Sequence, residues 1–270
     1  RGLGDVYKRQ DKTLGFIFYQ HLRINNLMVT FGFDYKKYGG SGKNINYKKD
    51  FGKHYVYEYA PYFNTQYFAG NWIFNFGYRI EKNKVYGYEE APKFGVSRKI
   101  SNGNITLNIS KGYRSPTIRE LYLFPAPNPD LKPENLWNRE IDFNYHFSQS
   151  CKLTTSVFEM RGNNYIKTLG AYPNLRLENS GKFVHKGIEL SLSGLKIKGL
   201  ENNISYSWID VGDNTANVPE HKLNLSIQKN YKKFGSLLSI QKVWNYYGSD
   251  FKKNRLKDYL YSRINVSYNI

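Results

Sequence analysis

The stretch NITLNIS, Asn104–Ser110, alternates polar and apolar residues without a break. Successive side chains of a β-strand point to opposite faces, so Ile105, Leu107 and Ile109 share one face and the Asn, Thr and Ser side chains share the other. This period of two predicts a strand with one apolar and one polar face. Such a strand suits a soluble sheet with one covered face, and equally a barrel wall between lipid and water.

The same alternation recurs along most of the chain, for example in IDFNYHF (141–147), HKLNLSI (221–227) and SRINVSYNI (262–270). It predicts about thirteen strands. Their centres lie near residues 17, 30, 60, 76, 96, 108, 142, 156, 188, 205, 225, 239 and 264. Most span about 9–13 residues, longer than is typical of soluble sheets and close to the length that crosses a bilayer at a tilt.

The connections alternate between short and long. Short turns are expected at 21–25, 69–71, 101–103, 148–150, 194–199 and 230–233, and long loops at 36–53, 82–90, 112–136, 162–181, 211–217 and 246–257. An outer-membrane barrel has this layout, with short periplasmic turns and long extracellular loops. We therefore predict an all-β fold, a partial antiparallel transmembrane β-barrel. A soluble β-sandwich or barrel is the competing reading.

Composition agrees with a barrel and excludes a helical membrane protein. Mean hydropathy is −0.65, and no window holds the eighteen or so consecutive apolar residues that a spanning helix needs. Aromatic residues reach 17%, which suits girdles at membrane interfaces. The single cysteine, Cys151, excludes an intramolecular disulfide framework. Residues 1–12 do not continue the alternation, so we expect a non-native or unstructured leader there and the barrel portion at 13–270.

No pattern points to an enzyme. The five His residues show no paired spacing typical of metal ligands, and no nucleophile stands with a base. We therefore expect no catalytic residue, no metal site and no cofactor. The net charge of +18 allows a nucleic-acid or polyanion binder as a competing class. No oligonucleotide-binding or RNA-recognition signature supports that class, so no nucleic-acid partner is expected.

One segment departs from the strand pattern and carries family motifs. GYRSPTIRELY (112–122), followed by NPDLKPE (128–134), closely resembles the signature of TonB-dependent outer-membrane receptors. ENSGKFVHKGIELSL (178–192) and VPEHKLNL (218–225) resemble two further motifs of that family. The matching residues are Tyr113, Arg114, Pro116, Glu120, Leu121, Asn128, Pro129, Leu131, Pro133, Glu134, Asn179, Gly181, Gly187, Glu189, Pro219 and His221. The resemblance is specific over roughly residues 90–270.

The resemblance implies a location in the bacterial outer membrane and a barrel of about 22 strands. It also implies a plug domain and a TonB-contacting segment, neither of which this chain contains, and an aromatic last residue where Ile270 stands. The implied function is TonB-dependent uptake of a small anionic metal chelate, with a ferric siderophore as the leading candidate. Haem and cobalamin are the alternatives within the family, and a passive porin is the alternative outside it.

The long segment after residue 112 is expected to lie over the barrel mouth. Its ligand-contacting candidates are Arg119, Tyr122 and Phe124, joined by Tyr172 from a second loop. The competing reading is that residues 121–124 only pack on neighbouring loops. Lysines and arginines cluster at 36–53 and 252–257, where they could pair with the phosphates of lipopolysaccharide or attract an anionic chelate.

Overall fold

The computed structural model of the chain describes residues 7–45, 48–123, 126–170, 174–213 and 215–269. Nearly all regular structure in these residues is β-strand, and their one helix is α1 (Ile118–Tyr122). Within the described ranges, no helix is long and apolar enough to cross a membrane.

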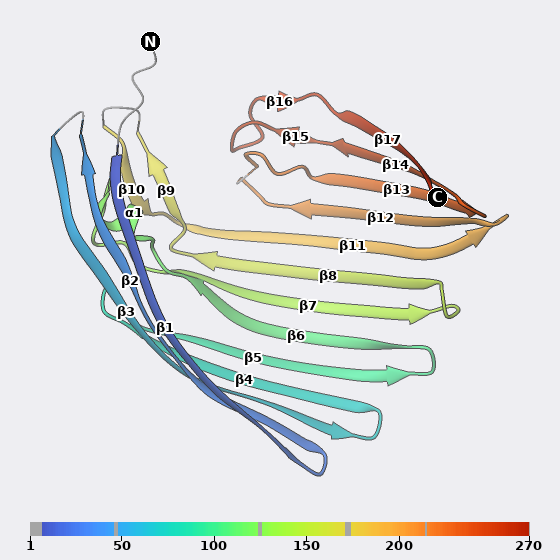
Figure 1. Cartoon of the computed structure of the whole chain (residues 1–270), viewed down its shortest axis with the longest axis horizontal. Helices are drawn as coiled ribbons and strands as arrows, with labels where there is room; N and C mark the ends of the chain where they lie inside the picture. The colour runs from blue at the N-terminus through green and yellow to red at the C-terminus, as the bar shows by residue number, and fades with distance from the viewer. Residues whose placement is uncertain (1–6, 46–47, 124–125, 171–173, 214, 270) are drawn as a thin grey trace.

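Thirteen strands form one antiparallel sheet in which each strand pairs with its neighbours in chain order (Figure 1). They are β1 (Tyr7–Ile24), β2 (Leu27–Asn44), β3 (Lys49–Ala69), β4 (Trp72–Asn83), β5 (Gly87–Ile100), β6 (Gly103–Arg114), β7 (Glu134–His146), β8 (Lys152–Asn163), β11 (Lys182–Ile197), β12 (Leu200–Asp210), β13 (His221–Tyr231), β14 (Phe234–Trp244) and β17 (Tyr259–Tyr268). Two small hairpins lie outside the sheet: β9 (Ile166–Leu169) with β10 (Arg176–Asn179), and β15 (Tyr246–Tyr247) with β16 (Arg255–Leu256). The predicted antiparallel barrel portion is confirmed.

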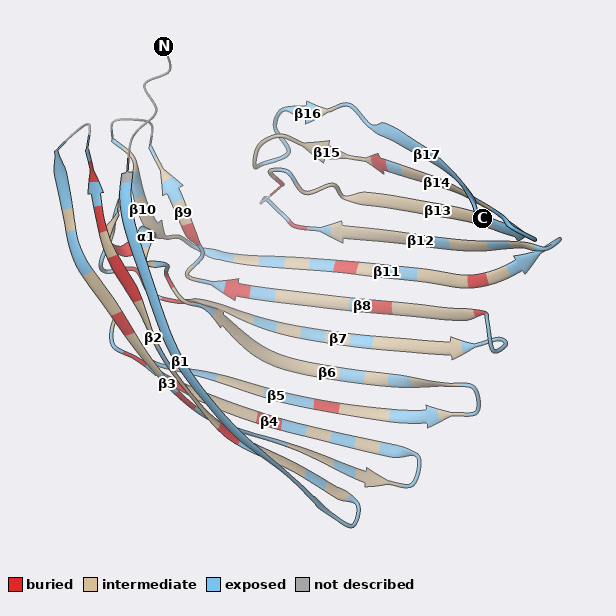
Figure 2. Ribbon diagram, viewed as in Figure 1, coloured by how far each residue is buried: buried red, intermediate tan, exposed pale blue. Residues whose placement is uncertain are grey.

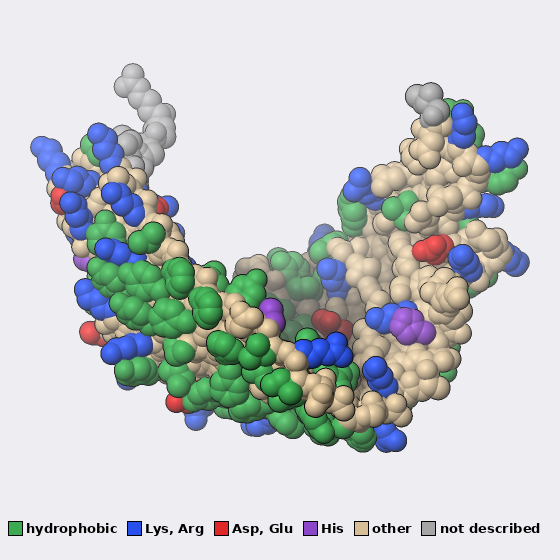
Figure 3. Space-filling view, turned by 60° about the horizontal axis from the view of Figure 1, so that its bottom comes forward, with side chains coloured by type: hydrophobic (Ala, Val, Ile, Leu, Met, Phe, Trp, Pro, Cys, Tyr) green, Lys and Arg blue, Asp and Glu red, His purple; other side chains and the backbone are tan. Residues whose placement is uncertain are grey.

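The sheet curls into a trough whose two faces differ in chemistry (Figure 3). We call the face that carries Ile105, Ile141 and Val157 the outer face. Cross-strand pairing makes it continuous, because Leu107 pairs with Ile141 and Ile141 with Val157. These apolar side chains are exposed, with 52% of Ile141 accessible. So large an exposed apolar band calls for an apolar surrounding.

The opposite, inner face is polar and hydrogen-bonded across strands. Its bonds join polar side chains, as in the pairs Thr106–Ser97, Asn108–Asp142, Ser156–Glu140 and Asn224–Ser205. Such a face suits water or a polar filling. The alternation seen in the sequence is therefore the wall of a barrel with an apolar exterior and a polar interior.

The two outermost strands, β1 and β17, each have one neighbour in the sheet, so the sheet is not closed in this chain. The described side chains of both strands are exposed along their whole length (Figure 2). Each strand therefore presents a row of backbone groups without a partner in the sheet. Such edges are templates for pairing with further strands.

Turns and loops alternate between the two ends of the strands, as predicted. The short-turn end has the connections 25–26, 70–71, 101–102, 147–151, 198–199 and 232–233. The loop end has 45–48, 84–86, 115–133, 164–181, 211–220 and 245–258. The long connections all lie at the loop end, which is where a binding surface can be built.

Two of the predicted long loops are wrong. Most of 36–53 belongs to β2 and β3, and only residues 45–48 connect them; likewise only 84–86 connect β4 and β5. The glycine-rich run GGSGKN resembled a loop, yet Gly40 pairs with Asp11 on one side and His54 on the other. A Cβ at Gly40 would lie 1.7 Å from the Gln10 carbonyl oxygen, so glycine here permits close strand approach.

β1 begins at Tyr7, whereas the sequence placed the beginning of the ordered barrel at residue 13. Lys8 to Lys12 pair with Lys43 to Gly39 of β2, although their side chains do not alternate in polarity. Backbone pairing along the extended β2 accounts for the difference, because it needs no apolar face. That residues 1–12 are non-native stays a prediction.

Candidate functional site

The segment 115–133 at the loop end begins with a short helix whose first turn is fully capped. The Thr117 hydroxyl accepts from the Glu120 N–H, and the Glu120 carboxylate accepts from the Thr117 N–H at 2.7 Å. This reciprocal capping box satisfies donors that the first turn leaves free. Pro116, fully buried, precedes the cap. Five residues are too few to form a stable helix alone, so the cap and the packing below account for α1.

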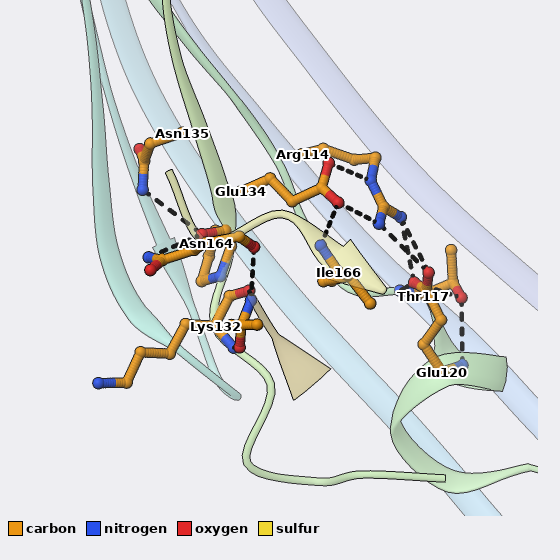
Figure 4. A network of polar contacts seen from close by, with 10 residues as sticks. Arg114, Thr117, Glu120, Lys132, Glu134, Asn135, Asn164 and Ile166 are labelled. Atoms are coloured by element: carbon orange, nitrogen blue, oxygen red, sulfur yellow. Dashed lines mark hydrogen bonds and ion pairs between the residues drawn. The ribbon is translucent and has the colours of Figure 1, made fainter. Parts of the chain in front are cut away.

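Arg114, the last residue of β6, holds both ends of this segment (Figure 4). Its Nε and Nη2 donate to the two carboxylate oxygens of Glu134 at 2.8 Å each, and its terminal nitrogens donate to Glu120 at 3.1–3.2 Å. Glu134 also accepts from the Ile166 N–H at 2.8 Å. We call Arg114, Glu120 and Glu134 the clasp. Paired planar contacts of this kind give both strength and defined orientation.

Asparagine side chains tie the β9–β10 hairpin to the same segment. Asn179 donates to the carbonyl oxygens of Lys132 at 2.8 Å and Asn164 at 2.7 Å, and its own side-chain oxygen accepts from the Lys132 N–H. Asn128 donates to the Leu177 carbonyl oxygen at 2.7 Å. These bonds satisfy backbone groups of irregular segments that no strand partner reaches.

A small apolar cluster fills the space beneath the clasp. Leu121, Leu131 and Ile166 are buried there. Packed against them are Val85, Tyr122 and Leu177. The Tyr122 ring also stacks on His54 of β3, with the ring centroids 4.0 Å apart. The loop segment is therefore held to β6, β7, the β9–β10 hairpin and the β2–β3 hairpin as one unit.

The clasp predicts a defined response to acid. Partial burial alone would raise the pKa of the Glu120 carboxyl, but bonds from Arg114 and Thr117 hold that pKa below its usual 4.5. A carboxyl group whose pKa is lowered in the folded protein stabilises the fold at pH values above its usual pKa. That stability is lost as the pH falls through the lowered pKa. We expect hydrogen-exchange protection of 115–133 to be constant from about pH 8 to 5 and to fall below about pH 4. In Glu120→Gln, protection should be lower at pH 7 and should not fall further in this acid range; an unchanged acid response would contradict the assignment.

A surface hollow of about 460 Å³ adjoins the clasp. It lies between the β4–β5 turn and residues 129–133, with Tyr86, Glu89, Lys132 and Asn164 among its lining residues. Tyr86 is fixed at its rim by hydrogen bonds to Glu81 and Ser115. Charged, amide and aromatic groups together suit a polar ligand better than an apolar one.

The four predicted ligand residues have different surroundings. Arg119 is exposed on α1. Tyr122 is half-buried, with one ring face covered by His54. Phe124 and Tyr172 lie outside the described residues. Leu121 is 1% exposed, so this residue packs against its neighbours, as the alternative to ligand contact expected. Contact of Arg119 or Tyr122 with a ligand stays a prediction.

The motif residues separate into two groups. The motif residues within 113–134, together with Asn179 and Gly181, lie in or beside the clasp and the neighbouring asparagine hydrogen bonds. The others lie elsewhere on the wall. Gly187 is buried where a Cβ would meet the Phe158 ring at 2.4 Å, Glu189 follows on the inner side of β11, and Pro219 precedes β13. His221 begins β13, bonds the Tyr206 hydroxyl at 2.8 Å and stacks on Trp244.

The predicted basic clusters lie at the loop end, and the structure pairs part of them. Lys37 lies over the rings of Tyr55 and Tyr57 in the β2–β3 hairpin. Lys43 pairs with Asp50 at 2.7 Å, and Lys252 pairs with Glu220 at 2.8 Å. Neutralising pairs reduce the charge of this rim without cancelling it, because lysines and arginines outnumber acids in both segments.

Sequence reasoning missed a polar network on the inner face near the loop end. Arg79 pairs with Asp34 and Glu81, and Tyr38 and Asn83 both donate to Glu58. Alternation alone could have placed these side chains on the inner face. Their contacts depend on the register of β2, β3 and β4, which no local signal specifies.

Comparison with known proteins agrees with this architecture. The family model described as TonB dependent receptor-like, beta-barrel matches residues 2–270. Vitamin B12 transporter BtuB of Photobacterium profundum is 29% identical over 164 residues, which cover 57% of this chain and 26% of BtuB.

Solved structures share the fold at low identity. The siderophore receptor PirA from Pseudomonas aeruginosa superposes with a TM-score of 0.80 at 15% identity, covering 99% of this chain and 52% of PirA. Copper transporter OprC superposes with a TM-score of 0.76 at 12% identity, covering 97% of this chain and 48% of OprC. The chain thus spans about half the length of these structures and a quarter of BtuB. Because the family model covers nearly the whole chain, this protein belongs to the TonB-dependent receptor β-barrel family, whose members are receptors and transporters of the outer membrane.

Proposed function

We propose that this chain is the loop-bearing, C-terminal part of a receptor that imports a small anionic metal chelate, with a ferric siderophore as the cargo. One observation supports the proposal above the others: toward the loop end, the inner side of the sheet combines a cation with aromatic rings above a polar wall. Lys36 lies over the Tyr38 ring there, and Tyr122 stacks on His54. Cations attract anionic chelates, and rings pack against their organic framework.

Energy for uptake is proposed to come from TonB, as in the family that the chain belongs to. The segment that contacts TonB, and the plug that closes the lumen, would be supplied by sequence outside these 270 residues. The chain itself supplies wall and loops. Lipopolysaccharide and other outer-membrane lipid are its proposed surroundings.

Cobalamin is a second candidate cargo, because BtuB, the vitamin B12 transporter, is 29% identical to this chain over 164 residues. Charge separates the candidates. Binding of a large anionic chelate should depend on the cations of the loop end, whereas binding of cobalamin should depend much less on them. Haem is the remaining alternative within the family.

Growth on single nutrients tests the proposal. The full-length protein, expressed in a bacterium that lacks its own siderophore receptors, should restore iron-limited growth on a ferric siderophore, and deletion of tonB should abolish this growth. Growth that survives loss of TonB would favour a passive porin. Rescue by cobalamin or haem alone would contradict the siderophore assignment.

Arg119 gives a site-level prediction. The substitution Arg119→Gln should weaken binding of the ferric chelate about tenfold, because it removes an exposed charge that can pair with the ligand. Titration of the purified full-length receptor with the chelate measures the change in Kd. Lys229→Gln, on β13 near the short-turn end, is the matched control and should leave Kd unchanged. Equal Kd values for Arg119→Gln and wild type would remove Arg119 from the site.

A further inference from the structure

On the outer face, four charged residues lie together where three adjacent strands, β7, β8 and β11, run side by side (Figure 1). Register makes Arg139 and Lys186 the two cross-strand neighbours of Glu159. Arg161 lies two residues further along β8, between Trp137 and Val184. We call Arg139, Glu159, Arg161 and Lys186 the outer-face cluster.

Three cations of this cluster converge on one carboxylate. Arg139 Nη1 lies 3.2 Å and Arg161 Nε 2.6 Å from Glu159 Oε1, and Lys186 Nζ lies 3.9 Å from Oε2. Arg161 Nη2 also donates to Oε2 at 3.0 Å. Asp210 is the other cross-strand neighbour of Lys186, and even with it the cations outnumber the carboxylates. The cluster therefore carries a net positive charge.

The cations keep donors for a further anion. A guanidinium has five N–H groups, whereas the bonds to Glu159 use one of Arg139 and two of Arg161. The side chains of Arg139, Arg161 and Lys186 are each 55% exposed, while that of Glu159 is 21% exposed. The carboxylate thus orients the cations from below and leaves them accessible from outside.

The cluster lies directly above the apolar band. On β7, β8 and β11, the next outer-face residues toward the short-turn end are Ile141, Val157 and Ile188, which pair in one row. Trp137, 41% exposed, flanks the cluster on the loop side. Since the loop end of an outer-membrane barrel is extracellular, the cluster lies where the hydrocarbon of the outer leaflet ends and its headgroups begin. Tryptophan is enriched at such a boundary.

We propose that the outer-face cluster binds a phosphate of lipid A, the membrane anchor of lipopolysaccharide. Two guanidinium groups and an ammonium group supply charge-assisted donors to the phosphate oxygens, and the row Ile141, Val157 and Ile188 packs on the acyl chains. The proposal rests on the outer-membrane location and is independent of the cargo. It differs from the loop-end cations, because the cluster faces the membrane and not the barrel mouth.

Lipid retention by the full-length receptor tests the site. The receptor and the triple variant R139Q/R161Q/K186Q are titrated in detergent with bisphosphorylated lipid A, with its dephosphorylated form and with inorganic phosphate. Wild type should bind the bisphosphorylated lipid at least about tenfold more tightly than the variant does, the loss expected for one or more charge-assisted bonds. Dephosphorylated lipid should bind both proteins equally and weakly.

The matched control K229Q/K232Q/K233Q removes the same charge from near the short-turn end and should bind lipid A as wild type does. Heat-modifiable migration on a gel verifies that every variant is folded. Equal affinity of R139Q/R161Q/K186Q and wild type for lipid A would overturn the proposal, and so would tight binding that does not depend on the lipid phosphates. Binding of inorganic phosphate without preference for the lipid would show an anion site only, which also overturns it. Chelate uptake is scored separately, so a failed lipid site leaves the proposed function standing.

Discussion

Arg114→Gln should disorder the segment 115–133 while leaving the strands of the wall intact. The substitution removes the shared cation between Glu120 and Glu134, which leaves two partly buried carboxylates close together. Because Arg114 is itself 44% exposed, we expect a loss of about 2 kcal/mol of local stability, below the cost of breaking a fully buried pair. Hydrogen-exchange protection of the segment should fall about 30-fold in the full-length receptor.

Arg119→Gln is the matched control for this measurement. Arg119 is exposed and lies on the same short helix, and it has no part in the clasp. Its substitution should change protection of 115–133 by less than about threefold, within the range of ordinary surface substitutions. If Arg114→Gln and Arg119→Gln gave the same protection, the clasp would not be what orders this segment.

Gly194→Ala should strongly destabilise the barrel wall. Gly194 has φ +70° and lies at the irregularity of β11 between Leu192 and Leu195. A Cβ there would lie 1.8 Å from the Ser150 carbonyl oxygen, in the β7–β8 turn. Positive φ and overlap with a neighbouring backbone together should cost about 3 kcal/mol or more.

Gly199→Ala separates the cost of the positive φ from the cost of the steric overlap. Gly199 has φ +75°, but a Cβ there meets nothing within 4 Å. Only the backbone preference is lost, so the cost should be about 1–2 kcal/mol. Denaturant unfolding of the full-length receptor in detergent, followed by heat-modifiable migration, measures both values. A cost for Gly194→Ala no larger than that for Gly199→Ala would show that the wall relaxes around the added methyl group.

The strands were predictable because their signal is local. Alternation in stretches such as 104–110 assigned both the extended backbone and the two faces. The prediction failed at 36–53, where glycines suggested a loop. There, the pairing of β2 with β1 and β3 extends the strands through residues of low strand propensity. Propensity is a weak guide where two neighbours supply the backbone hydrogen bonds.

The candidate site was predictable only residue by residue. The motifs singled out Arg114, Glu120 and Glu134, and the capping box could be read from Thr117 and Glu120. That one guanidinium joins both carboxylates was not visible, since Arg114 and Glu134 meet as cross-strand partners at the ends of β6 and β7. Asn179 reaches Lys132 only because the β9–β10 hairpin folds back onto the segment.

Taken alone, the sequence determined the number of strands in the main sheet, the polarity of each face and the order of turns and loops, because side-chain alternation depends only on the backbone of one strand. The two small hairpins at the loop end were not predicted. Tertiary structure decided which side chains meet: the clasp, the Arg79 network and the outer-face cluster all depend on register. A slip of two residues would keep every side chain on its face and change every cross-strand neighbour. The face that a side chain occupies therefore follows from the local sequence pattern, whereas the composition of a site depends on how whole strands align.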